Sequence, residues 1–246
     1  MKRVFYALLA LLILASCNGT RKVNENEIKV FAAASLTDVV TELAQKFEQE
    51  YNVTVKLNLA ASGTLARQID QGAEADVYLS ANKNWIDFLV EKQRTKETAV
   101  FAKNDLVLIS PLNKDFQFEK VDSLLTNSES KIAIGDPGFV PAGRYAMQVF
   151  DYYQLNIKDR YLQSQNVRSA LMMVELGEAD FGVVYKTDAL QSKKVNVIYT
   201  FPEETHKPVE YFRALISDKN LAKQFYDYLY SAETDNVLTN YSFIID

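Results

Sequence analysis

The stretch that decides the fold class is residues 28–52, IKVFAAASLTDVVTELAQKFEQEYN. It begins with a short β-rich run over residues 28–32. It continues with apolar residues at helical spacing from Leu36 to Tyr51, with polar residues between them. The same alternation of short strand and amphipathic helix recurs along the chain. This pattern predicts an α/β fold with mostly parallel strands.

The remaining elements follow from the same two periodicities. Further strands are predicted at 53–57, 76–80, 105–110, 131–134, 181–185, 195–199 and 209–216. Helices are predicted to begin near residues 62, 85, 141, 166, 221 and 237. Asn166 is the expected N-cap of a helix that ends at Gly177.

The composition excludes several classes of function. The 246 residues carry 27 Lys and Arg against 32 Asp and Glu, so the net charge of −5 offers no field that would attract nucleic acid. The single cysteine, Cys17, and the single histidine, His206, exclude an internal disulfide and a Cys/His zinc site. A catalytic triad would need His206, which lies in a polar, turn-like stretch and is expected to be a solvated loop residue.

The N-terminus is typical of an exported lipoprotein. Lys2 and Arg3 precede an apolar run over residues 4–14, which is shorter than the about 20 apolar residues that span a bilayer. Residues 14–17, LASC, resemble a bacterial lipoprotein signal. We therefore expect residues 1–16 to be a removed signal peptide, Cys17 to carry the lipid and residues 17–27 to form a polar tether. The protein is expected to be lipid-anchored on the periplasmic or extracytoplasmic face of a bacterial membrane.

Four predicted helix starts have small or polar residues where a ligand could approach the backbone. They are Ser35, Ser62 with Gly63, Ala142 in the run 141–143, and Val167 after Asn166. A helix N-terminus exposes unpaired N–H groups and the positive end of the helix dipole, which favour an anion. In open α/β sheets these turns gather at the carboxyl ends of the strands, where ligands bind. Any one of them alone is more often only a helix cap.

Six motifs, in this order, resemble the periplasmic molybdate-binding proteins of molybdate ABC importers. They are FAAASL (31–36), ASGTLARQI (61–69), ADVYLSA (75–81), GDPGFVPAGRYA (135–146), VRSAL (167–171) and GVVYKTDA (182–189). The resemblance covers nearly the whole chain after the tether. It implies a type II periplasmic-binding-protein fold with the ligand in a cleft between two α/β lobes. Lobe 1 would comprise residues 28–104 and 205–246, and lobe 2 residues 105–204.

The resemblance also implies which residues bind molybdate. Ser35 and Ser62 would each donate a hydroxyl and a backbone N–H. Ala142 and Val167 would donate backbone N–H groups, and Tyr185 its phenolic O–H. No free metal cation and no cofactor is expected, because the metal arrives as an oxyanion. A lining of donors alone would disfavour protonated anions such as hydrogen phosphate.

The expected function is therefore a monomeric, non-enzymatic lipoprotein that captures molybdate or tungstate and delivers it to an ABC permease. Three alternatives stay open: a binding protein for sulfate, phosphate or an organic anion, an exported hydrolase, and a purely adhesive or structural lipoprotein. Arg144 is expected at the surface, but in the cleft it would weaken discrimination against sulfate. Asp136 and Asp188 are expected to cap loops rather than to act in catalysis.

Overall fold

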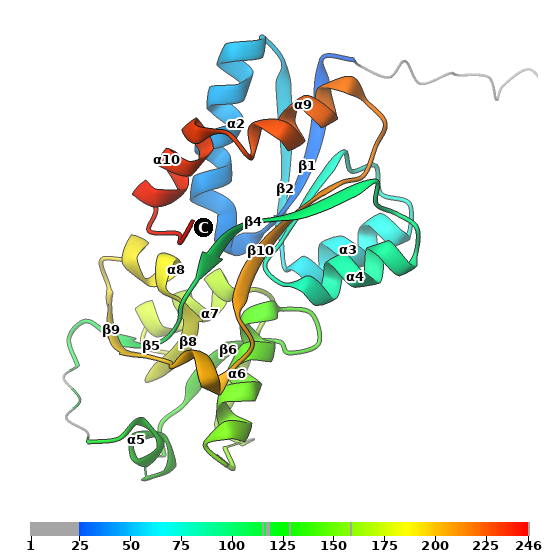
Figure 1. Ribbon diagram of the computed structural model, residues 1–246. Helices are drawn as coiled ribbons and strands as arrows, with labels where there is room; N and C mark the ends of the chain where they lie inside the picture. The colour runs from blue at the N-terminus through cyan, green and yellow to red at the C-terminus, as the bar shows by residue number, and fades with distance from the viewer. Residues whose placement is uncertain (1–24, 115, 117–118, 128, 158, 246) are drawn as a thin grey trace, which may run out of the picture.

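Two five-stranded sheets form the two halves of the molecule, one above the other in Figure 1. The computed structural model describes residues 25–114, 116, 119–127, 129–157 and 159–245. The predicted signal peptide and Cys17 lie outside these residues, as does the tether up to residue 24. We call the upper half of Figure 1 the first lobe and the lower half the second lobe.

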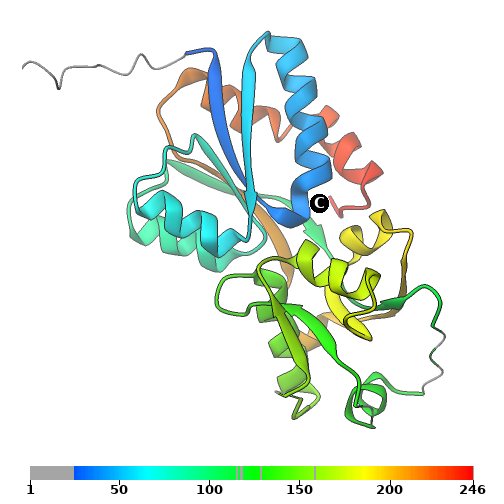
Figure 2. The same cartoon turned by 180° about the vertical axis from the view of Figure 1, so that it is seen from behind.

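The sheet of the first lobe has the order β2-β1-β3-β10-β4. Its strands are β1 (Glu27–Ala33), β2 (Thr54–Ala60), β3 (Val77–Ser80), β4 (Glu97–Asn104) and β10 (Val209–Leu215). Its helices are the short 3-10 helix η1 (Ala34–Leu36), α2 (Thr37–Tyr51), α3 (Ser62–Asp70), α4 (Lys83–Glu91), α9 (Asn220–Tyr228) and α10 (Ala232–Asn240). Figures 1 and 2 show α3 and α4 on one face of the sheet, and α2, α9 and α10 on the other.

The sheet of the second lobe has the order β7-β6-β8-β5-β9. Its strands are β5 (Leu106–Pro111), β6 (Ile132–Gly135), β7 (Tyr161–Ser164), β8 (Phe181–Tyr185) and β9 (Val195–Thr200). Its helices are α5 (Val121–Asn127), α6 (Pro141–Tyr152), α7 (Val167–Glu175) and α8 (Lys186–Gln191), and the 3-10 helix η2 (Glu203–Thr205) follows β9. The predicted α/β class is therefore confirmed in both halves.

The expectation of mostly parallel strands is wrong, because each sheet is half antiparallel. β1 pairs parallel with β2 and β3, and β6 with β7 and β8. In contrast, β10 is antiparallel to β3 and β4, and β5 is antiparallel to β8 and β9. The antiparallel strands are the ones by which the chain passes between the lobes. A strand that enters a sheet from the other lobe needs no crossover helix, so it is free to run in the opposite direction.

Within the described ranges, the chain crosses between the lobes twice. The first crossing is at Asp105, between β4 and β5, and the second spans residues 201–208, between β9 and β10. β4 and β10 lie side by side along seven paired positions, with a register shift at Tyr211 and Phe212. The two crossings therefore share one antiparallel ribbon, which Figure 1 shows running from the first lobe toward the second.

The amphipathic patterns explain why the helices pack as they do. In α2 the residues Val39, Val40, Leu43 and Phe47 are buried, as their spacing predicts. The helix ends where Asn52 adopts a left-handed conformation with φ of 53°. No helix in the described ranges has both the length and the apolar character needed to cross a bilayer.

Candidate functional site

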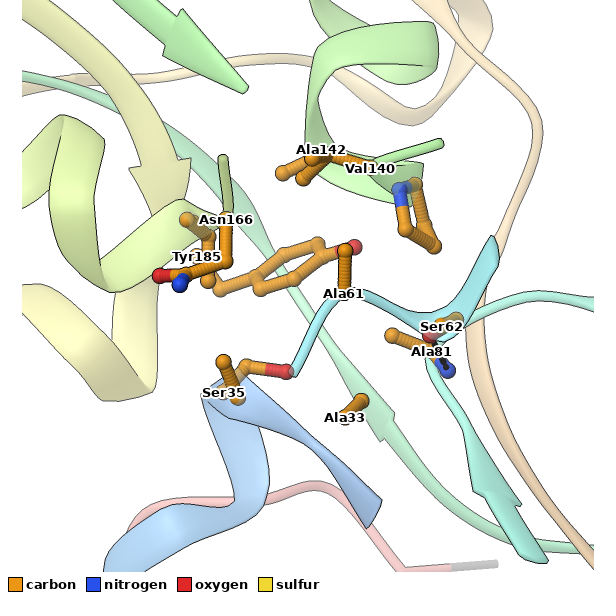
Figure 3. Close-up of a pocket in the computed structure, with 12 residues that line it drawn as sticks. Ala33, Ser35, Ala61, Ser62, Ala81, Val140, Ala142, Asn166 and Tyr185 are labelled. Atoms are coloured by element: carbon orange, nitrogen blue, oxygen red, sulfur yellow. Dashed lines mark hydrogen bonds between the residues drawn. The ribbon is translucent and has the colours of Figure 1, made fainter. Parts of the chain in front are cut away.

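One pocket lies between the lobes where the carboxyl ends of six strands meet. Residues at or just after the ends of β1, β2 and β3 line it from the first lobe, and residues just after β6 and β7 and at the end of β8 line it from the second. The lining residues are Ala33, Ala34, Ser35, Ala61, Ser62, Ala81, Val140, Pro141, Ala142, Asn166, Val167 and Tyr185. The space between the lining atoms is about 200 Å³ when the solvent at its mouth is included, so the enclosed part of the pocket is small. All five residues predicted to bind the ligand are among them. Figure 3 labels Ser35, Ser62, Ala142 and Tyr185.

Ser35 lies in η1, the single turn that joins β1 to α2. Its side chain is buried, and its hydroxyl oxygen accepts a hydrogen bond of 3.0 Å from the Tyr211 hydroxyl. Within the described part of the chain, no protein acceptor receives the Ser35 proton at hydrogen-bond distance. That proton is therefore available to a ligand.

Ser62 is the first residue of α3, and it does not cap the helix as a serine at this position commonly does. The N-cap residue is Ala61, without a side-chain hydrogen bond. The Ser62 hydroxyl instead accepts from the backbone N–H of Ala81 at 3.1 Å, just after β3. Both serine oxygens thus accept from the protein, which leaves both O–H groups to donate into the pocket.

The second lobe supplies the first turns of two helices. Ala142 follows Pro141 at the start of α6, and Val167 is the first residue of α7. The backbone N–H groups of a first helical turn have no partner within the helix. The Asn166 side chain accepts from the N–H of Ser169, as an N-cap should, which confirms the prediction for Asn166.

Gly143 explains how α6 comes so close to the end of β6. A Cβ atom at this position would lie 1.9 Å from the Gly135 carbonyl oxygen. Only glycine permits this approach, and it brings the adjacent Ala142 to the pocket.

Tyr185 ends β8 and lies across the middle of the pocket, between Ala142 and Ser35 in Figure 3. The side chain is 1% exposed, and its hydroxyl has no hydrogen-bond partner among the described residues. A buried hydroxyl without a partner is costly, and it marks a place where a ligand acceptor is expected. Burial raises the pKa of Tyr185 well above its ordinary value, so the group stays a proton donor.

No charged side chain lines the pocket in the described part of the chain. Arg144, the residue expected at the surface, is half-buried and is not among the lining residues. It donates to the carbonyls of Pro137 and Gly138, and its guanidinium lies 4.8 Å from the centre of the Trp85 ring in the first lobe. Arg144 therefore belongs to a contact between the lobes and not to the lining.

Two further contacts join the lobes beside the pocket. The N–H of Gly63 donates to the Phe139 carbonyl at 2.9 Å. Arg168 of α7 pairs with Asp38 of α2 in the other lobe and with Asp188 of its own lobe. The described structure is thus one in which the lobes touch around the pocket.

The contacts of Asp136, Asp188 and His206 do not suggest a catalytic role for any of the three. Asp136 accepts from the N–H of Gly138 and caps its loop, as predicted. The prediction for Asp188 is wrong, because this fully buried carboxylate pairs with Arg168 instead of capping a loop. His206 lies outside the pocket lining, with Nδ1 2.8 Å from the Lys207 carbonyl. The described residues include no group of three or more His, Cys, Asp or Glu arranged to hold a metal ion.

Sequence reasoning missed three residues that hold the site. Ala81 supports Ser62, Tyr211 supports Ser35, and Asn104 contacts Tyr211. Ala81 lies in the motif 75–81, but a backbone N–H leaves no mark in the sequence. Tyr211 and Asn104 lie on β10 and β4, and only the pairing of those strands brings them to the pocket.

Comparison with known proteins gives several full-length relatives. The chain is 38% identical to the "Molybdate-binding protein ModA" of Escherichia coli over 92% of each chain. It is 38% identical to the "Molybdate-binding protein ModA" of Haemophilus influenzae, over 88% of this chain and 89% of that one. A periplasmic molybdate-binding protein of Azotobacter vinelandii superposes with a TM-score of 0.79 at 23% identity, over 89% of this chain and 99% of that one. That structure supports the predicted periplasmic-binding-protein fold.

Two family matches cover both parts of the sequence. Residues 1–18, which include Cys17, match the prokaryotic membrane lipoprotein lipid attachment site, so the chain is an exported protein anchored to a membrane, as predicted. Residues 28–244 match a second family over nearly all of the remaining chain. By that match, and by its 38% identity to full-length relatives, the chain belongs to the bacterial extracellular solute-binding proteins.

Proposed function

We propose that this chain binds molybdate or tungstate in the pocket between its lobes and delivers it to an ABC permease. One observation carries the proposal: donors from both lobes converge on a single pocket whose described lining includes no charged side chain. The names of the relatives that share 38% identity over most of the chain support the same ligand. In this proposal Ser35, Ser62, Ala142, Val167 and Tyr185 bind the oxyanion.

The energetics of such a site are favourable without any cation. Moving a dianion out of water is costly unless every oxygen accepts hydrogen bonds. Each hydrogen bond to a charged acceptor contributes about 1.5–3 kcal/mol. The first turns of α6 and α7 add the positive ends of two helix dipoles. Several such bonds together outweigh the cost of desolvation and of bringing the lobes together.

The pocket also supports selection against protonated anions. The lone pairs that Ser35 and Ser62 turn toward the protein are occupied by the Tyr211 hydroxyl and the Ala81 N–H. The Asn166 side-chain oxygen accepts from the N–H of Ser169. Hydrogen phosphate would therefore bring an O–H group to a lining in which these three acceptor positions are already taken, which disfavours it relative to a fully deprotonated anion. An arginine, which would favour other anions, is absent from the described lining.

The proposal extends to how the protein works as a whole. Cys17 carries the lipid, the protein acts as a monomer without enzymatic activity or cofactor, and the permease takes the anion from it. Residues 28–104 with 205–246 and residues 105–204 move as two lobes about the paired crossings. Trp85 is the only tryptophan of the sequence and contacts Arg144 across the lobes, so its fluorescence should change when molybdate closes the cleft.

The first test is calorimetric titration of the lipoprotein in detergent with molybdate, tungstate, sulfate and phosphate. Binding of one molybdate or tungstate per chain, with no heat from sulfate or phosphate, is the expected result. Binding of sulfate or phosphate in preference to molybdate would overturn the choice of substrate. Turnover of generic ester or phosphate substrates would contradict the non-enzymatic role.

A further inference from the structure

We propose that Tyr211 and Asn104 form a positioning chain that points the Ser35 hydroxyl proton into the pocket. Neither residue lines the pocket, and both act through Ser35. This inference rests on the proposed function, because it concerns how the same pocket is prepared for an oxyanion.

The orientation of the Asn104 amide is fixed by two backbone donors. Its side-chain oxygen accepts from the N–H of Asp105 at 2.9 Å and from the N–H of Thr187 at 3.4 Å. An N–H group cannot donate to an NH₂ group that is itself a donor, so the amide nitrogen must point the other way. That nitrogen lies 2.8 Å from the Thr187 hydroxyl and 3.4 Å from the Tyr211 hydroxyl.

The orientation of Asn104 then fixes the direction of the Tyr211 hydroxyl. Because the Asn104 nitrogen donates to the Tyr211 oxygen, the Tyr211 proton cannot point at Asn104. Among the described residues, the remaining neighbour at hydrogen-bond distance is the Ser35 hydroxyl oxygen, at 3.0 Å, and Tyr211 donates to it. Tyr211 is fully buried, and burial raises its pKa well above the ordinary value, so its proton is retained.

The last step sets the state of Ser35. A hydroxyl has one proton and two lone pairs, and Tyr211 occupies one lone pair of the Ser35 oxygen. The Ser35 proton therefore points away from Tyr211, and Ser35 itself lines the pocket. The chain of donors turns a hydroxyl that could either donate or accept into one that donates to the ligand.

The chain also spans both lobes. Asn104 is the last residue of β4 in the first lobe, and Thr187 lies in α8 of the second lobe, two residues after Tyr185. The two backbone N–H groups that orient Asn104 thus come from the crossing itself and from the second lobe. The direction of the Ser35 proton depends on the geometry of the crossing at Asp105.

A double-mutant cycle on the lipoprotein in detergent tests this chain. Molybdate affinity is measured by calorimetry for the wild type, Tyr211→Phe, Ser35→Ala and the double variant. We expect Tyr211→Phe to weaken binding roughly tenfold when Ser35 is present and to have no further effect when Ser35 is alanine. Tyr145→Phe is the matched control: its hydroxyl bonds the Pro208 carbonyl, away from Ser35, and affinity should stay unchanged.

The outcomes separate this inference from the proposed function. If the wild type does not bind molybdate, the proposed function fails. If the wild type binds and Tyr211→Phe is either without effect or weakens binding by the same factor in both backgrounds, the positioning chain is wrong. A thermal melt of each variant establishes that it is folded.

A second variant keeps the test usable if Tyr211→Phe does not fold. Asn104→Asp retains acceptors for the two backbone N–H groups but turns an acceptor toward Tyr211. Tyr211 would then donate to the carboxylate, and its oxygen would face Ser35 as an acceptor that competes with the ligand for the Ser35 proton. We expect a larger loss of affinity with Ser35 present than with Ser35→Ala, and equal losses would contradict the chain.

Discussion

The first lobe faces the pocket with two serine hydroxyls, whereas the second lobe faces it with two helix N-termini and one tyrosine. Each serine depends on another part of the first lobe for its orientation: Ser35 on Tyr211 and Ser62 on the N–H of Ala81. The donors at Ala142 and Val167 depend instead on where α6 and α7 begin. The difference shows that one binding site is held on one side by side-chain hydrogen bonds and on the other by backbone geometry.

This difference determines which substitutions can damage each side. On the first lobe, removal of a hydroxyl removes a donor and also leaves its protein partner unpaired. At Ala142 and Val167 of the second lobe, most side-chain changes leave the N–H donor in place, and only proline removes it.

Ser62→Ala should have the largest combined effect. It removes one hydrogen bond to the anion, which should weaken molybdate binding by about 1.5–3 kcal/mol. It also leaves the buried Ala81 N–H without its acceptor, which should lower the free energy of unfolding by about 1–3 kcal/mol. Calorimetry and urea unfolding measure the two losses.

Ser110→Ala is the matched control for Ser62→Ala. Ser110 is equally buried, but its hydroxyl has no hydrogen-bond partner within the described residues and lies outside the pocket lining. This variant should keep molybdate affinity and should not lower stability, because it removes a buried hydroxyl that has no partner among the described residues. Equal behaviour of the two alanine variants would show that the bond between Ser62 and Ala81 has no energetic role.

Val167→Pro should weaken molybdate binding by about 1.5–3 kcal/mol and leave the helix intact. Proline is favoured at the first position of a helix, where the missing N–H has no partner within the helix. The preceding residue, Asn166, is already extended, with φ of −159° and ψ of 172°, as a residue before proline requires.

The control for this variant is Val167→Ala, which keeps the N–H and loses buried methyl groups. It should lower stability and leave molybdate affinity unchanged, as measured by the same calorimetric titration. If the alanine variant loses as much affinity as the proline variant, the backbone donor at Val167 is not the binding group.

The sequence predicted the pocket better than the sheets around it. Ser35, Ser62, Ala142 and Val167 were identified as helix starts after strands, and parallel strands bring such starts to one edge. This reasoning is local, because each turn is a few residues of small or polar character. The strands β4 and β7 and the helices α5 and α8 were not predicted.

The parts that escaped prediction depend on distant pairing. β4 has only two adjacent buried positions, Phe101 and Ala102, with a further buried residue at its end, so its sequence lacks a strand alternation. It forms a strand because it pairs with β10, more than a hundred residues later. The contact between Asn104 and Tyr211 results from that pairing and has no local signal.

Tyr185→Phe should weaken molybdate binding by about 1.5 kcal/mol while raising the stability of the free protein. The hydroxyl has no partner within the described residues, so phenylalanine removes an unpaired polar group and keeps the buried ring. A loss of affinity together with a gain in stability would distinguish Tyr185→Phe from Ser62→Ala, which should lose both. Thermal unfolding with and without molybdate measures both, and normal binding by this variant would make Tyr185 a core residue only.

Asp38→Asn should have the smallest effect, because it changes only the contact between the lobes. Arg168 keeps its buried partner Asp188 in the second lobe and loses the charge of Asp38 in the first. Since Asp38 is partly exposed, the pair should contribute about 0.2–1 kcal/mol to the closed state, or a loss of molybdate affinity of about 1.5–5-fold. Asp87→Asn removes a comparable exposed pair, with Lys83 inside the first lobe, and should not change affinity. The ligand and the pair of Arg168 with Asp38 both hold the two lobes together. Equal molybdate affinities for Asp38→Asn and Asp87→Asn would therefore mean that this contact between the lobes is not coupled to binding.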